Sequence, residues 1–165
     1  MSVNNVQSNF SNGMSYSANL VTANIQPYTV PVVKISAATT LSVSDSGKVF
    51  SVSAPNVADY TITLPDPTGQ SALKYSFVIN STLLKKVTIA SGKAATMTGF
   101  ALGPDDGTNK FGKSVDGGNK VNISFATGSL NGDKIDIVSD GTNFYASGFS
   151  ALAGAGAGAC SITFA

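Results

Sequence analysis

The sequence predicts an all-β protein, and three observations support this. All nine acidic residues are aspartate and all ten basic residues are lysine, so glutamate and arginine, two good helix formers, are absent. Ser, Thr, Asn, Gly and Val are abundant instead, which favours strands and turns. Short runs of alternating apolar and polar residues recur every eight to fifteen residues or so, a spacing typical of a sandwich or barrel.

The strand candidates follow one another along the chain from residue 28. Their apolar residues mostly alternate with Ser, Thr or Lys, as expected for strands with one buried face. Pro31 confines the first candidate to a sheet edge or a bulge. The predicted strands are residues 28–35, 39–44, 48–53, 60–64, 74–80, 85–91, 95–102, 120–126, 134–139, 144–149 and, as a short final strand, 160–164.

Two pairs of these candidates are predicted to form hairpins. Residues 39–44 and 48–53 are separated by the short turn sequence "SDSG", which predicts a hairpin. The stretch "KIDIVSDGTNFYASGFSA", residues 134–151, contains Asp136 and Asp140 and could hold an ion instead. A helix-flanked calcium loop starting at Asp136 would need ligands where Val138 and Ser147 stand, so the hairpin interpretation is preferred.

Residues 1–27 are predicted to form an extended arm, and residues 28–165 a single β-sandwich domain. The arm is polar and cannot bury enough apolar surface to fold alone, so it is either a disordered tail or an arm ordered by a neighbouring subunit. The candidate anchors of such an assembly arm are Val6, Phe10, Met14, Tyr16, Leu20 and Ile25.

The composition excludes several classes of chemistry. Without histidine, a Ser–His or Cys–His catalytic arrangement and any histidine metal site are impossible. Without arginine, there is no bidentate phosphate clamp, and no basic patch interleaved with aromatics suggests nucleic-acid binding. We therefore expect no enzyme activity, no cofactor and no nucleic-acid partner.

Two loop sequences contain residues of the kinds found in ligand sites. The loop 103–119 is rich in oxygen ligands that suit calcium, but Lys110 and Lys113 oppose a cation there, so it is only a weak metal candidate. Its possible ligands are Asp105, Asp106, Asn109 and Asp116. The small-residue stretch "GAGAGA", residues 154–159, lacks the third glycine and the following helix of a dinucleotide site and is rejected.

The single Cys160 cannot form an internal disulfide, and its apolar neighbours favour a buried free thiol over an intermolecular disulfide. The N-terminal residues lack the basic start and apolar core of a signal peptide. No apolar run is long enough to span a bilayer, so no membrane partner is expected.

Several of these segments together resemble β-rich virion proteins of tailed bacteriophages. The resemblance covers residues 39–149 and is most specific in the final hairpin. Its segments are "TTLSVSDSGKVFSVS", "YTITLP", "KYSFVIN", "VTIAS" and "GDKIDIVSDGTNFYASG". It implies a jelly-roll-like antiparallel β-sandwich with an extended N-terminal arm, often trimeric, used as a capsid decoration (cement) protein or in tail fibres and spikes.

The short chain with one domain favours, within this resemblance, a decoration protein on the outer capsid surface. Its expected partners are further copies of itself, as a homotrimer, and the major capsid protein. One alternative is a tail-fibre or spike module that binds a host glycan through loops 65–73 and 103–119, where Phe111 is the single aromatic residue. Another is a minor capsid protein of a larger virus.

Overall fold

Strands make up nearly all regular structure in the computed structural model, which describes residues 8–9, 15–16, 29–54, 58–93, 95–103, 120–150 and 162–165. One 3-10 turn, η1 (Val43–Asp45), interrupts them. Strands β1 (Ser8–Asn9) and β2 (Ser15–Tyr16) pair with each other. The others are β3 (Val32–Ile35), β4 (Thr39–Thr40), β5 (Val49–Val52), β6 (Tyr60–Thr63), β7 (Ser71–Ile79), β8 (Val87–Ala90), β9 (Met97–Leu102), β10 (Asn122–Phe125), β11 (Lys134–Asp140), β12 (Phe144–Phe149) and β13 (Ile162–Phe164).

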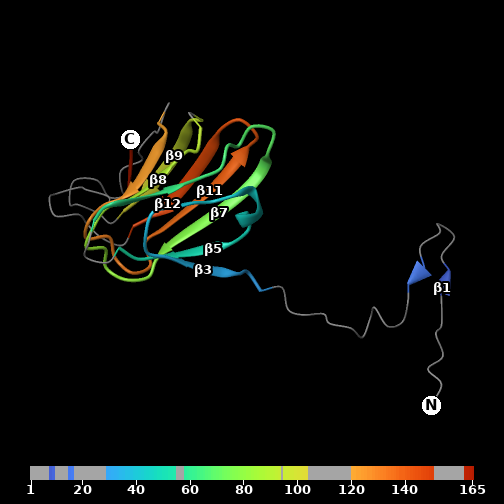
Figure 1. Cartoon of the computed structure of the whole chain (residues 1–165), viewed down its shortest axis with the longest axis horizontal. Helices are drawn as coiled ribbons and strands as arrows, with labels where there is room; N and C mark the ends of the chain where they lie inside the picture. Colours follow the sequence, from blue (N-terminus) through green and yellow to red (C-terminus); the bar gives the residue numbers. More distant parts are fainter. Residues whose placement is uncertain are drawn as a thin grey trace, which may run out of the picture.

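Strands β3 to β13 form two sheets that enclose one core (Figure 1). The six-stranded sheet has the order β3-β5-β7-β11-β12-β9, and the five-stranded sheet has the order β13-β10-β8-β6-β4. The all-β prediction is confirmed. Within the described residues, no helix is long and apolar enough to cross a membrane.

The chain alternates between the two sheets from β3 to β8. Strands β3, β5 and β7 therefore run parallel in one sheet, and β4, β6 and β8 run parallel in the other. Two consecutive strands, one in each sheet, therefore make one turn of a flattened coil. We call strands β3 to β8 the winding. Antiparallel pairing enters through β7–β11, β11–β12, β8–β10 and β10–β13, while β12 pairs parallel with β9. The expectation of an antiparallel sandwich is thus wrong for the winding part, because a chain that returns to the same sheet after crossing the other sheet runs in the same direction.

The predicted hairpin between residues 39–44 and 48–53 is also wrong. Strand β4 lies in the five-stranded sheet and β5 in the six-stranded sheet, so the intervening residues cross between the sheets. The Asp45 carboxylate accepts hydrogen bonds from the Ser42 backbone N–H at 2.8 Å and from Lys48 Nζ at 2.5 Å. Gly47, with φ of 85°, then donates its N–H to the Lys74 carbonyl oxygen. The turn sequence therefore caps a 3-10 turn instead of closing a hairpin.

The core consists of rows of side chains that run across the strands. In the six-stranded sheet, Phe50 and Phe77 are neighbours, and their rings stack with centroids 5.2 Å apart. In the five-stranded sheet, one row joins Ile62, Ile89 and Ile123. All five side chains are at most 1% exposed. The prediction that these strands have one buried face is confirmed.

Candidate interaction surfaces

The hairpin predicted for residues 134–149 is confirmed as β11 and β12. Its two carboxylates, Asp136 and Asp140, both form hydrogen bonds within the sheet. Asp136 lies on the outer face of the sheet. Its oxygens accept hydrogen bonds from Ser76 Oγ at 2.5 Å and from Lys134 Nζ at 2.7 Å. Burial alone would raise the pKa of Asp136, but these two bonds outweigh it and hold the pKa below its usual value.

Asp140 organises the turn between the two strands. Its Oδ1 accepts the backbone N–H groups of Thr142 at 2.8 Å and Asn143 at 2.7 Å, and these bonds lower its pKa. Its Oδ2 accepts the Tyr145 hydroxyl at 3.0 Å. Gly141 supplies the left-handed backbone conformation, with φ of 95°. Both carboxylates are thus part of the hairpin's own hydrogen bonding.

The outer face of β9, β11 and β12 carries a group of exposed large apolar side chains, which we call the aromatic face. Three rows cross these strands: Asp136–Ser147–Phe100, Val138–Tyr145–Thr98 and Lys134–Phe149–Leu102. The exposed apolar members are Phe149 at 57%, Tyr145 at 51%, Phe100 at 44%, Leu102 at 41% and Val138 at 39%. An apolar group of this kind, rimmed by polar side chains, is typical of an interaction surface.

The aromatic face is hollowed on both sides of Phe100. One depression of about 340 Å³ extends to Val138 and Tyr145, and another of about 330 Å³ extends to Lys134 and Phe149. Asp136 and Ser147 line both depressions. The surface therefore offers aromatic rings beside hydrogen-bonding groups.

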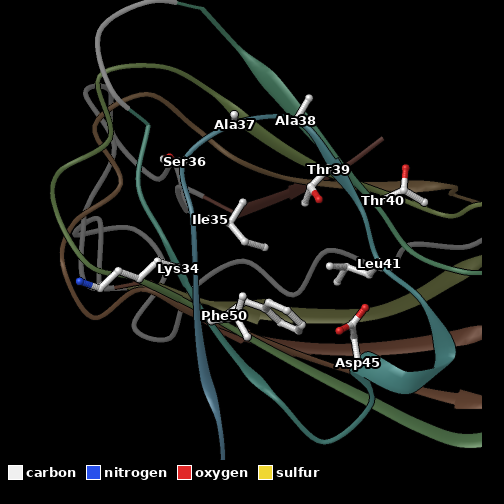
Figure 2. A pocket seen from close by; sticks show the side chains of 11 residues that line it. Lys34, Ile35, Ser36, Ala37, Ala38, Thr39, Thr40, Leu41, Asp45 and Phe50 are labelled. Atoms are coloured by element: carbon white, nitrogen blue, oxygen red, sulfur yellow. The ribbon is translucent and has the colours of Figure 1, made fainter.

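A second surface is the open end of the winding, where β3 and β4 are the edge strands of the two sheets. A hollow of about 390 Å³ lies between them, with Ile35, Leu41 and Phe50 on its apolar side (Figure 2). Asp45 lines it as well, and its hydrogen bonds from Lys48 and Ser42 lower its pKa to about 2. Near it, the Tyr60 hydroxyl joins the sheets by donating to the Ser53 carbonyl oxygen at 2.6 Å.

The remaining residues singled out from the sequence are not placed by the structure. The weak metal candidates Asp105, Asp106, Asn109 and Asp116 lie outside the described residues, as do Cys160 and the arm residues Val6, Phe10, Met14, Leu20 and Ile25. Only the backbone of Tyr16 is described, in β2. Among the described residues, no three His, Cys, Asp or Glu side chains are grouped so as to hold a metal ion.

The aromatic face was not identified from the sequence, although a signal for it exists. In residues 144–149, Phe144 and Ala146 alternate inward while Tyr145 and Phe149 alternate outward. Strand β9 repeats this, with Met97 buried on one side and exposed apolar residues on the other. Apolar residues on both faces of a strand are typical of strands that are covered on both sides.

Comparisons of the chain with models of protein families, with curated proteins and with solved structures found no match. The resemblance to phage virion proteins therefore stays a prediction drawn from the segments quoted above.

Proposed function

We propose that the protein is a structural component of a virion, a capsid decoration protein that attaches to the outer capsid surface and reinforces it without catalysing a reaction. The observation that supports this most directly is the aromatic face. Its five apolar side chains are each roughly half exposed, on three adjacent strands of which the middle one, β12, pairs along its whole length with β11 and with β9. A rigid sheet that presents such a group is suited to burial against another protein.

The energetics of this face suit a repeated assembly. Complete burial of a Phe or Leu side chain contributes roughly 1.5–3 kcal/mol, so covering half of each contributes about 1 kcal/mol per residue. One copy would gain a few kcal/mol before the cost of association. In this proposal the protein is a homotrimer, because several such contacts on one particle multiply into a high avidity. The partners are further copies of the chain and the major capsid protein.

The fold is compatible with this role. Paired strands on a packed core give a stiff body, and in this proposal the residues before β3 form an N-terminal arm. In this proposal only the antiparallel part of the sandwich resembles a jelly roll. That part consists of strands β7–β11–β12 and β8–β10–β13.

The experiment is a measurement of the copy number of the protein in purified particles of the virus that encodes it, by quantitative mass spectrometry against labelled peptides. A decoration protein should be present in hundreds of copies, in a fixed ratio to the major capsid protein. A few copies to a few tens would place the protein in the tail, and absence from the particles would overturn a virion role.

The second candidate is a tail-fibre or spike module that binds a host glycan. It is favoured by one specific feature, because Phe100, Tyr145 and Phe149 offer rings for stacking beside the polar groups of Asp136 and Ser147. A low copy number would support it. Glycan-array binding that is lost in Tyr145→Ala would then identify the face as the sugar site.

A further inference from the structure

The open end of the winding lacks a covering strand within the described residues. Strand β4 is paired with β6 alone, through Thr39–Ile62 and Thr40–Thr63. The Leu41 N–H donates to the Thr63 carbonyl oxygen at 2.8 Å. Because successive N–H groups of a strand point to opposite sides, the Thr40 N–H points to the open side of β4. An edge of this kind is a template for a further strand.

The two edges at this end differ in how well they are protected. Strand β3 has Pro31 before it and the exposed Lys34 within it, and proline and lysine both discourage pairing at an edge. Along β4, by contrast, residues 36–41 carry no charge and no proline. Four of them, Ser36, Ala37, Ala38 and Thr40, are exposed. Strand addition is therefore expected at β4.

We propose that the open end binds residues 1–28 of a second copy, which add a strand beside β4, so that copies exchange their N-terminal arms. This segment carries no charged side chain, like the β4 edge itself. Within it, Val21, Ala23 and Ile25 alternate with Thr22 and Asn24. A strand of this sequence turns one apolar side toward the hollow and one polar side toward solvent.

The size of the hollow fits this occupant. At about 390 Å³ it is within the roughly 300–1,000 Å³ range of pockets that hold drug-sized ligands, so it has room for several side chains. Ile35, Leu41 and Phe50 supply the apolar wall. Thr39 and Ile62 are neighbours in one row of side chains across the five-stranded sheet. The apolar side of the arm would add a further side chain to this row, next to Thr39.

The path of the chain into β3 indicates that the occupant comes from another copy. The segments that lead into β5 and β7 pack against the body of the protein. Leu41 and Leu64, which begin these segments, are buried, and Gly69 donates its N–H to the Gly141 carbonyl oxygen. Residues 29–31 are all exposed instead. Within the described residues, the start of β3 is therefore left uncovered, and in this proposal the segment before it continues onto a neighbouring copy. In this proposal residues 26–31 link the docked strand to β3 and span up to about 20 Å when extended, at roughly 3.3 Å per residue, so the two copies lie side by side.

This inference deepens the proposed function, on which its role in assembly rests, but its test needs only the purified protein. Two full-length variants are mixed, both with Cys160→Ser and one with an affinity tag. One carries Asn24→Cys in the arm, and the other carries Thr40→Cys on β4. A short bis-maleimide should join the two different copies. In the control mixture Thr163→Cys replaces Thr40→Cys, because Thr163 is exposed on β13 at the opposite edge of the same sheet.

The arm-to-β4 product is expected at least about tenfold more often than the arm-to-β13 product, because a docked arm raises the local thiol concentration from micromolar toward millimolar. Equal yields from the two mixtures would overturn the proposal. So would a cross-link confined to single chains when one copy carries both Asn24→Cys and Thr40→Cys. Neither of these results would bear on the copy number in virions, so the two proposals fail separately.

A variant that blocks the edge gives an independent check. Thr40→Lys places a charge on the β4 edge at an exposed position, so the fold should be retained, as circular dichroism will show. Light scattering is expected to show a loss of oligomer relative to the wild type, while Thr163→Lys keeps it. A wild type that is monomeric at about 100 µM, a concentration well above a micromolar dissociation constant, would contradict arm exchange.

Discussion

At the scale of single residues, Ala72 has a backbone conformation that its side chain disfavours. Its φ is 63°, the single positive value of a non-glycine residue in the described part of the chain. It lies where the pairing of β7 with β11 shifts register, since Lys74 faces Val138 but Ser71 faces Asp140. Glycine is the residue that such a bulge favours.

We therefore predict that Ala72→Gly stabilises the protein by about 0.5–1 kcal/mol, because relief of the left-handed strain of roughly 1–2 kcal/mol exceeds the entropic cost of glycine. The urea midpoint of unfolding measures this. Ala90→Gly, in the regular strand β8, should instead destabilise by a similar amount. A loss of stability in both variants would refute the strain at residue 72.

Asp45 leads to a prediction about pH. The pKa of Asp45 is lowered from 3.8 to about 2 by its hydrogen bonds from Lys48 and Ser42. Because the folded-state pKa is depressed, the carboxylate stabilises the fold above about pH 4, and this contribution disappears as pH falls through about 2.

Asp45→Asn should reduce the free energy of unfolding by up to about 1 kcal/mol at pH 7, because the group is near the surface and screened by solvent. Chemical unfolding at pH 7, 4 and 2 should show the two proteins converge; a constant difference would contradict the assignment.

At the scale of elements, strand β9 depends on Gly99. A Cβ atom at this position would overlap the Ala146 carbonyl oxygen of the neighbouring strand β12. Gly99→Ala should therefore push β9 away from β12 and destabilise the protein by roughly 1–3 kcal/mol, the usual cost of overpacking. Thr98→Ala, on the outward side of the same strand, should change stability by less than about 0.5 kcal/mol. Equal unfolding midpoints for the two variants would show that β9 does not approach β12 so closely.

The sequence predicted the strands well and their partners poorly. Alternation in residues such as Tyr75, Phe77 and Ile79 marks the buried face of a strand, and the structure confirms it. The alternation of apolar and polar residues does not reveal which sheet a strand joins. The parallel winding therefore cannot be predicted from it. The turn before β5 was mistaken for a hairpin because Asp and Gly suit a capped 3-10 turn equally well.

The interaction surfaces were harder to predict for a different reason. Phe100 and Phe149 are not adjacent in sequence, and only the pairing of β12 with β9 brings their rows together. The hollow at the open end depends likewise on which strands become the sheet edges. The hairpin with Asp136 and Asp140, by contrast, is local, and its sequence alone was sufficient.

At the scale of the whole molecule, the described core and the proposed N-terminal arm occupy different parts of the chain. Among the described residues, every member of the core cluster lies between Ile35 and Phe164. Deletion of residues 1–27 should therefore leave the body folded, although its unfolding free energy should fall by the amount that arm docking between copies contributes. Attachment to capsids that lack the protein should weaken. Calorimetry and co-sedimentation measure the two effects, and an unfolded deletion variant would contradict this division of the chain.

The proposed function requires that the aromatic face is buried against protein in the assembled virion. Hydroxyl-radical footprinting of Tyr145 and Phe149, read by mass spectrometry, compares their exposure in the free protein and in purified particles. Labelling should fall at least about fivefold in particles, as expected for side chains in the dry centre of an interface. Labelling of Tyr60, which lies away from this face, should serve as the internal reference. Equal labelling of the face in free and particle-bound protein would show that it is not an interface in the virion.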